Sequence, residues 1–489
     1  MCKFASQNKK KTQVKLSIFA TLLLFFTFLI QLSASEESDS KIAYPEGKCY
    51  MFRVLLSDKY GTPYSIDRPK EFLSEKAIIR RQCQNLEVDS TDLPVSPVYI
   101  NYIRDYGVNI IGVSKWNNSL LVRSDNLSVP DLLTKLPFVR KTIKVWTSPD
   151  SITSCKGRLR KHNMFNKWDT IPDKYYGAGE EQIKVLNGTK LHDEGFVGKG
   201  MTIAILDGGF MNADIISAFN KAKIEGHKDF VYPFSGSVFE GTDHGTKVMS
   251  EMASYVPYIL IGTAYKASFW LIRCEDQQSE SLAEEDYWAE SAEFADSVGV
   301  DIINSSLGYS DFDDSSTNHR YSDMDGEKTL ISHTASMLAQ KGIILVNSAG
   351  NTGMGTWKKV AFPADAKDIL CVGAIGKNHI NAPFSGVGPT QDGRVKPDIM
   401  SIGSPAAVIT GRGTLIQDTG TSFSAPILCG LVACLWQALP QLTAIQIMDL
   451  VKRSGNNYAT PDNIYGYGVP DFWHAYLLGV SELHNTNTK

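Results

Sequence analysis

The chain of 489 residues is 43% hydrophobic and 21% charged, and its formal net charge is −4. This balance excludes the strongly basic surface on which nucleic-acid binding depends, so no nucleic-acid partner is expected. The length and the apolar fraction allow about two to four globular domains.

Residues 1–35 have the pattern of a signal peptide rather than of a folded segment. A lysine-rich start, residues 9–15, precedes fifteen uncharged residues, 16–30, and small residues then lead to Ser35. This is the layout of an export signal, with cleavage expected after Ser35. The apolar run is short for a membrane span. We therefore expect an exported (periplasmic or secreted) protein with no stable membrane span after cleavage; an uncleaved N-terminal anchor is the alternative.

Residues 36–147 are predicted to form a small α+β domain. Strand patterns at 49–57, 108–113, 119–123 and 139–146 alternate with helical patterns at 70–85, 95–106 and 129–136. With the first two helical pieces counted as one unit, the order is βαββαβ, which is ferredoxin-like. The alternative is an ordinary accessory or adhesive domain.

Residues 148–174 are predicted to be a basic linker. Four of the six residues from 156 to 161 are basic, namely Lys156, Arg158, Arg160 and Lys161, and no apolar periodicity accompanies them. Exposed polar stretches of this kind are preferred sites of proteolytic cleavage. The linker is therefore the expected place of a maturation cut.

Residues 175–480 are predicted to form an α/β domain, followed by a polar tail at 481–489. Strand patterns at 269–274, 301–305, 343–347 and 369–375 alternate with helical patterns at 283–298 and 328–340. This alternation predicts a doubly wound, mostly parallel sheet with helices on both faces.

Residues 420–426, Gly-Thr-Ser-Phe-Ser-Ala-Pro, place a serine at the start of an almost wholly apolar helical run. A glycine permits the sharp turn before such a helix. Unpaired N–H groups and the helix dipole at this end stabilise negative charge beside Ser422. The alternative is that Thr421 or Ser422 only caps the helix.

Three further polar residues occur in comparable settings. Asp207 ends an apolar strand-like run and is followed by two glycines, whereas His244 lies between glycines at the expected start of a helix. Asn351 follows the strand pattern 343–347 in a glycine-rich turn. Each alone could be a cap, a structural histidine or a turn residue.

Together these residues match the needs of nucleophilic catalysis. Ser422 needs a base to accept its proton, and His244 has the appropriate pKa range. Asp207 would orient the imidazole and stabilise its protonated form. Asn351 and the backbone N–H of Ser422 would donate hydrogen bonds to the oxyanion that forms on the substrate carbonyl.

Taken in chain order, the four segments resemble the subtilisin-like (subtilase) serine peptidases over about residues 177–475. The order Asp, His, Ser is the one found in subtilisin. The resemblance implies a subtilisin-like fold and makes residues 36–147 a propeptide. Motifs at 61–65, 72–74 and 92–96 resemble the leader of exported subtilases from Bacteroidetes-type bacteria.

The resemblance also implies a substrate groove in which an extended peptide pairs with the enzyme backbone. Ala361 resembles the base of the primary pocket, and its small uncharged side chain predicts an apolar or aromatic residue before the scissile bond. The residues expected to line the groove on its two sides are Ser306, Leu307 and Gly308, and Ser348, Ala349 and Gly350.

The predicted function is that of an exported serine endopeptidase made as a precursor. Its partners would be protein or peptide substrates and its own propeptide, which would act as intramolecular inhibitor and chaperone. The alternatives are a catalytically silent binding or scaffold protein on the same fold, or an esterase or amidase.

No cofactor is required by this chemistry, and no metal ligand is predicted. The acidic stretches 311–314 and 323–327 suggest calcium as an alternative, but Glu327 lies too near the glycine for an EF-hand loop, so no clear site supports it. The eight scattered cysteines are expected to be mostly buried thiols, with one disulfide as the alternative.

The sequence departs from the common subtilase pattern at three places. Asp207 is followed by Gly208 instead of Ser or Thr, Phe423 replaces a frequent Met, and Lys247 replaces a frequent His. None of these changes removes an atom that the proposed chemistry uses.

Overall fold

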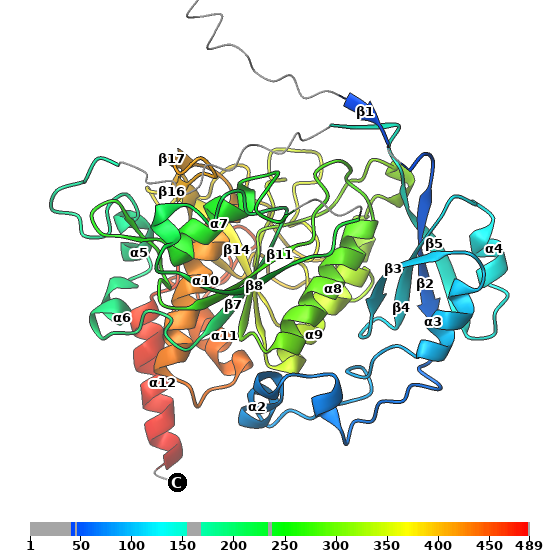
Figure 1. Cartoon of the computed structure of the whole chain (residues 1–489). Helices are drawn as coiled ribbons and strands as arrows, with labels where there is room; N and C mark the ends of the chain where they lie inside the picture. The colour runs from blue at the N-terminus through cyan, green and yellow to red at the C-terminus, as the bar shows by residue number, and fades with distance from the viewer. Residues whose placement is uncertain (1–40, 45, 154–167, 233–236, 488–489) are drawn as a thin grey trace, which may run out of the picture. The chain divides into compact units, whose positions relative to one another are not determined.

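A computed structural model describes residues 41–44, 46–153, 168–232 and 237–487 (Figure 1). The predicted signal peptide and the basic residues 156–161 of the predicted linker lie outside the described residues. The chain divides into two compact units. The smaller contains the antiparallel strands β1 (Lys41–Ala43) and β6 (Ser151–Thr153), and the larger contains residues 46–149 and 157–489.

A seven-stranded parallel sheet forms the centre of the larger unit, as the alternating pattern predicts. Its order is β15-β14-β13-β12-β7-β11-β8, and every neighbouring pair is parallel. The strands are β7 (Thr202–Asp207), β8 (Lys223–Asp229), β11 (Ser268–Arg273), β12 (Ile302–Ser305), β13 (Ile344–Ser348), β14 (Leu370–Gly376) and β15 (Ile399–Ser404). The chain order reverses between β7 and β12, and ligands of such sheets bind at the carboxyl ends of the strands there.

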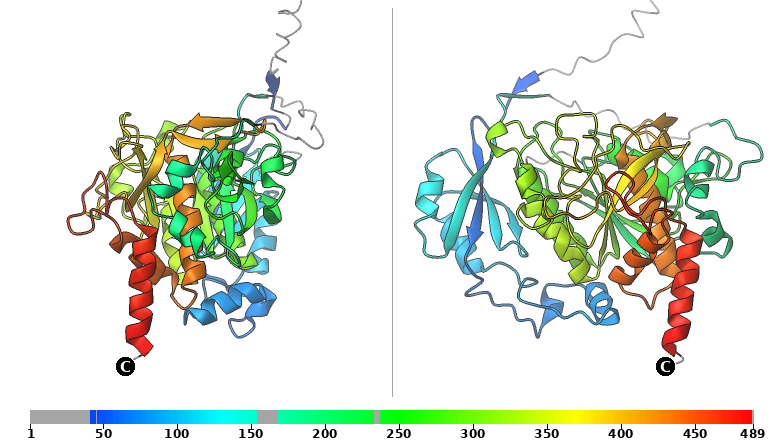
Figure 2. Two further views of the ribbon diagram at one scale, coloured as in Figure 1. Left: turned by 90° about the vertical axis from the view of Figure 1, so that its left-hand side faces the viewer. Right: turned by 180° about the vertical axis from the view of Figure 1, so that it is seen from behind.

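Helices cover both faces of this sheet (Figures 1 and 2). Helices α8 (Ala283–Val298) and α9 (Leu330–Met337) pack together on one face, and α7 (His244–Ala253) and α10 (Thr421–Ala438) on the other. The remaining helices of this part are α5 (Glu180–Lys184), α6 (Thr189–Asp193), α11 (Ala444–Arg453) and α12 (Phe472–Asn487). Short strand pairs are β9 (Tyr255–Val256) with β10 (Leu260–Ile261), and β16 (Ala406–Ile409) with β17 (Leu415–Asp418).

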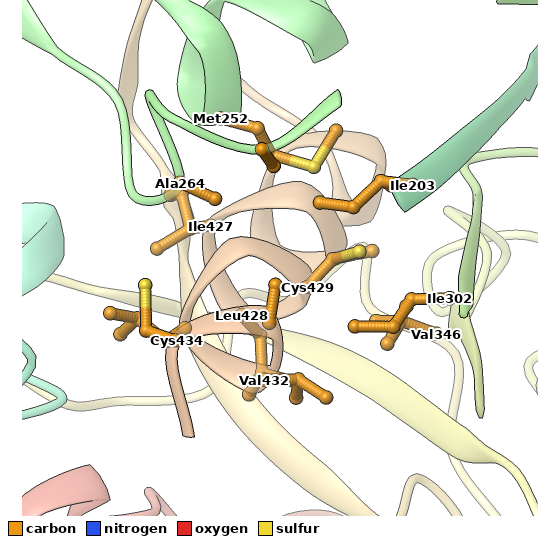
Figure 3. Packing of buried hydrophobic residues seen from close by; sticks show 14 of the residues in the cluster. Ile203, Met252, Ala264, Ile302, Val346, Ile427, Leu428, Cys429, Val432 and Cys434 are labelled. Atoms are coloured by element: carbon orange, nitrogen blue, oxygen red, sulfur yellow. The ribbon is translucent and has the colours of Figure 1, made fainter. Parts of the chain in front are cut away.

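Helix α10 lies in the core and packs against β12, β13, β14 and β15 of the sheet. Figure 3 shows its residues Leu428, Cys429 and Val432 among strand residues such as Ile302 and Val346. By length and composition alone α10 could span a membrane, but 89% of its most apolar window is buried inside the fold. This burial is that of a central helix in a globular domain.

Residues 50–147 form a four-stranded antiparallel sheet of order β3-β4-β2-β5, the ferredoxin-like arrangement. The elements are β2 (Tyr50–Leu56), α2 (Glu75–Cys83), α3 (Pro97–Arg104), β3 (Asn109–Ser114), β4 (Ser119–Ser124), α4 (Val129–Leu133) and β5 (Val139–Thr147). Residues of α3 and α4, including Tyr99, Ile103 and Leu133, pack on this sheet.

The two helical pieces at 70–85 and 95–106, which were counted as one unit in the βαββαβ order, are separate helices in the structure. The first piece breaks into a 3-10 turn, Pro69–Glu71, and α2, because Ser74 caps α2 by accepting from Ala77 N. The buried face of α2 carries Arg80 and Arg81, so this helix packs against α8 instead of the small sheet.

The described part of the chain ends in a helix. Helix α12 continues to Asn487, so most of the predicted polar tail at 481–489 is helical. Within the described residues, six cysteines are free thiols, and all of them except Cys83 are buried.

Candidate active site

Asp207 and His244 form the best defined polar pair at the carboxyl edge of the sheet. Asp207 is the fully buried last residue of β7, and His244 is the first residue of α7. His244 Nδ1 lies 2.9 Å from both Asp207 carboxylate oxygens. Although burial alone lowers it, the charge and hydrogen bond of Asp207 raise the pKa of His244 to about 9.

The glycines around this pair allow the close approach. Gly245 N donates to Gly209 O at 2.9 Å, and a Cβ on Gly245 would lie 2.5 Å from the same oxygen. Only glycine lets the start of α7 rest on the turn after Asp207 in this way.

Ser422 is the second residue of α10, and Ser306 holds it. Ser422 Oγ donates to Ser306 O at 3.2 Å, and Ser306 Oγ donates to Ser422 O at 2.8 Å. Pro426 lacks the N–H that would pair with the Ser422 carbonyl, which leaves that oxygen free for Ser306. In the described structure, the Ser422 hydroxyl and the His244 ring do not form a hydrogen bond with each other. Catalytic hydrogen bonds of this kind often form only in the complex with substrate.

Asn351 lies beside the start of α10 with its amide orientation fixed. Asn351 Oδ1 accepts from both the backbone N and the Oγ1 of Thr421, each at 3.0 Å. The Nδ2 group is therefore left as a donor. Sequence analysis missed the role of Thr421, although its position next to Ser422 in the motif was a signal.

The predicted groove residues come together as two chain segments on either side of Ala361. Residues 306–308 follow β12, and Ser348 ends β13 with Ala349 and Gly350 after it. A Cβ on Gly308 would lie 2.8 Å from Ala361 Cβ, and one on Gly350 would lie 2.9 Å from it. Ala361 itself is buried and donates its N–H to Ala349 O at 2.9 Å.

Glu275 is a residue of this site that sequence analysis missed. It follows β11, and a Cβ on Gly208 would lie 2.3 Å from Glu275 Oε2. The carboxylate thus occupies the space that a Ser or Thr side chain after Asp207 would take. The glycine at position 208 was therefore the signal in the sequence that another side chain fills this space. Burial and then the Asp207 charge raise the pKa of Glu275 to about 7.

The acidic stretches considered for calcium have protein partners instead. Asp314 accepts from Ser316 N and pairs with Lys144, and Asp325 accepts from Lys328 N and pairs with its side chain. Among the residues that the structure describes, no group of three or more His, Cys, Asp or Glu is placed to hold a metal ion.

Comparisons with known proteins match two parts of the chain. Residues 198–468 match the model of the subtilase family, peptidase S8, and residues 51–162 match that of the peptidase S8 propeptide domain of Bacteroidota. Subtilisin NAT of Bacillus subtilis subsp. natto is 26% identical over 303 residues, 62% of this chain and 72% of that protein. Subtilisin E of Bacillus subtilis (strain 168) is 25% identical over the same shares. A solved structure, MycP1 with its N-terminal propeptide removed, is 23% identical with a TM-score of 0.49 and covers 60% of this chain and 96% of its own.

Proposed function

The chain belongs to the subtilase family of serine-type endopeptidases, and on this premise we propose that Asp207, His244 and Ser422 are its catalytic triad and that Asn351 supplies the oxyanion hole. The observation that carries the proposal is the contact of His244 Nδ1 with both oxygens of the buried Asp207 carboxylate, 2.9 Å each. A buried carboxylate in this position fixes the imidazole tautomer and leaves Nε2 to act as the base.

The reaction follows from these positions. Ser422 Oγ turns from Ser306 O toward His244, which takes its proton as the oxygen attacks the substrate carbonyl carbon. The carbonyl oxygen becomes an oxyanion that accepts from Asn351 Nδ2 and Ser422 N. His244 then returns the proton to the leaving amine, and water releases the acyl group from Ser422 by the same steps in reverse.

We further propose residues 306–308 and 348–350 as the segments that bind the substrate backbone. The small buried Ala361 between them supports an apolar or aromatic residue before the scissile bond. Esterase or amidase activity without cleavage of proteins is the second candidate in the same site, and a catalytically silent protein is the third.

The protein is made as a precursor with an N-terminal propeptide domain. We propose residues 1–35 as the export signal, 36–147 as the propeptide, 148–174 as the linker that is cut, and 175–480 as the catalytic domain. The proposal that the propeptide inhibits the enzyme is supported by Trp146, near the end of β5, whose Nε1 donates to Ser279 Oγ of the catalytic domain at 3.0 Å.

Labelling with a fluorophosphonate probe tests the triad. Wild-type protein should be labelled on Ser422 and should cleave an unfolded protein substrate, whereas Ser422→Ala should do neither. The matched control Ser424→Ala removes a hydroxyl from the same helical turn and should keep both properties. Labelling of Ser422→Ala, or labelled wild type that cleaves small esters but no unfolded protein, would contradict the proposal.

A further inference from the structure

Four carboxylates lie in the segment from the end of β11 to the first turn of α8, and the first of them, Glu275, lies next to the Asp207–His244 pair. They are Glu275, Asp276, Glu280 and Glu284. Burial and then neighbouring negative charges raise the pKa of Glu275 and of Glu280 to about 7, and the pKa of Glu284 well above its ordinary value. These groups therefore repel one another in a partly buried place.

No Lys or Arg of the described residues forms a salt bridge with them, and Arg273 only partly offsets the burial that raises the pKa of Asp276. Arg273, at the end of β11, is engaged by Asp229, with its Nε 3.0 Å from Asp229 Oδ1. Lys144 of the propeptide pairs with Asp314 at 3.3 Å. Within the described part of the chain, no salt bridge reaches any of the four carboxylates.

A separate observation shows that this place lacks a partner. Glu284 is fully buried, yet its Oε2 has no hydrogen-bond partner within the described residues, and neither has the buried hydroxyl of Tyr309. The Glu284 carboxyl lies near this group, since the charges of Glu280, Glu275 and Asp276 act on it. Buried polar atoms are nearly always paired, so an external donor is the expected complement.

The sheet places these carboxylates relative to the groove. Along its carboxyl edge, the pocket segments follow β13 and β12, Asp207 ends β7, and Glu275 follows β11, the next strand. Two strand spacings, roughly 10 Å, separate β12 from β11. A long side chain from a residue next to the one in the primary pocket spans this distance, because successive side chains of an extended peptide point to opposite sides.

We propose that Glu275, Asp276, Glu280 and Glu284 form a cation subsite that binds a Lys or Arg side chain of the substrate residue immediately before the one in the primary pocket. This inference rests on the proposed function, and it names the substrate class of the same groove. A guanidinium or ammonium supplies the donor that Glu284 Oε2 lacks, together with a positive charge for the whole group. Gly208 is part of the subsite, because any larger residue there would displace Glu275.

The chain contains such a sequence in its predicted linker. From residue 148 to the end of the linker, a basic residue directly precedes an apolar or aromatic side chain at Arg158-Leu159, at Lys167-Trp168 and at Lys174-Tyr175. Trp168 donates to Gly413 O at 3.0 Å, and Tyr175 O accepts from Tyr258 N at 2.9 Å, so both residues are held by the folded catalytic domain. The subsite therefore predicts that the maturation cut falls after Leu159.

Matched peptides test the subsite in the mature enzyme. They differ only in the residue before a fixed Leu, which is Arg, norleucine or Glu. We expect kcat/KM for the Arg peptide to exceed that for the norleucine peptide roughly 10- to 100-fold, the usual worth of hydrogen bonds to a charged group, with Glu poorest. Glu275→Gln should bring the ratio close to one. Glu181→Gln removes an exposed carboxylate on α5 and should leave the ratio unchanged.

Equal cleavage of the Arg and norleucine peptides by active wild type would overturn the inference. So would an equal ratio combined with stabilisation by added Ca²⁺, which would make the carboxylates a metal site. Failure to cut any of the peptides, together with no fluorophosphonate labelling, would instead contradict the proposed function.

The maturation site gives an independent readout in the full chain. The mature protein should begin at Arg160, and Arg158→Met should slow the appearance of that terminus. Arg160→Met removes a neighbouring positive charge on the other side of the bond and should have a smaller effect. Equal rates for the two variants would contradict the subsite.

Discussion

The two ends of α8 carry carboxylates that are equally buried but differently paired. Asp296, near its last turn, is contacted by the propeptide residues Arg80, Arg81 and Lys115, with Arg81 Nη1 at 2.9 Å and Lys115 Nζ at 3.4 Å. Although burial alone raises it, these charges hold the pKa of Asp296 well below its usual range. At the first turn, burial and neighbouring carboxylates raise the pKa of Glu284.

The comparison distinguishes two roles of a buried carboxylate, one that stabilises the precursor and one that binds substrate. Where the propeptide supplies the counter-charge, the carboxylate holds the precursor together. Glu293 belongs to the same interface, since it accepts from Lys115 N at 2.7 Å and Trp116 N at 3.1 Å. At the first turn, Arg53 of the propeptide pairs with Asp286 at 2.7 Å and with Glu285 at 3.3 Å, whereas Glu284 has no salt bridge among the described residues. In the proposed subsite, the substrate supplies the partner of Glu284.

Removal of one charge at each end of α8 should change stability in opposite directions. In the uncut Ser422→Ala precursor at pH 8, Asp296→Asn should lower the free energy of unfolding by about 3–5 kcal/mol, because buried arginines lose their partner. Glu284→Gln should raise it, because a carboxyl whose ionised form is disfavoured by burial is replaced by a neutral amide while the bond from Ser281 N is kept. Chemical denaturation measures both values, and a loss of stability in both variants would contradict the comparison.

The same pair should differ in pH dependence. Asp296 has a depressed pKa in the folded state, so its stabilisation is present above the unfolded pKa and is lost as the pH falls through the folded value. Glu284 has a pKa that burial raises in the folded state. Its contribution to the free energy of unfolding is therefore present below the unfolded pKa and is lost as the pH rises through the folded value. Denaturation curves between pH 4 and 9 should show that Glu284→Gln abolishes part of the alkaline loss.

Asn351→Ala tests the proposed hydrogen-bond donor to the oxyanion. The negative charge of the oxyanion forms only during the reaction, whereas the carboxylates of α8 belong to the folded chain. We expect kcat to fall by about 10²–10³, or about 2.7–4 kcal/mol, with KM nearly unchanged; this magnitude is the one measured in subtilisin, a relative. Asn378→Ala alters another turn asparagine, which accepts from Ile380 N, and should keep kcat. Full kcat in Asn351→Ala, or loss through unfolding, would reduce Asn351 to a turn residue.

The smallest expected effect is a shift of the pH profile. Asp207 and Glu275 raise the pKa of His244, and Lys247 lowers it. Because the base must be neutral, kcat/KM should rise with pH through that pKa of about 9. Glu275→Gln should move the rise to lower pH and Lys247→Met to higher pH, each by less than about one unit. Shifts of the same sign in both variants would contradict the assignment of charges.

The sequence predicted those parts of the fold and of the site that local sequence patterns determine. Asp207, Asn351 and the groove residues lie at strand ends, and alternating apolar runs locate those ends. Thr421 and Glu275 were missed although local signals existed, because their roles depend on contacts with residues far away in the sequence, Asn351 and Gly208 respectively. The placement of α2 depends on ion pairs with Asp296, which lies over 200 residues away in the sequence, and helical periodicity carries no information on such a partner.

The most direct measurement is the mass of the purified chain with and without the Ser422 hydroxyl. Wild type should convert to a fragment that begins between residues 148 and 180, and Ser422→Ala should stay uncut. Active wild type added in trans should then cut the Ser422→Ala precursor at the same bond. If purified Ser422→Ala processed itself at the wild-type rate, Ser422 would not be the nucleophile of this site.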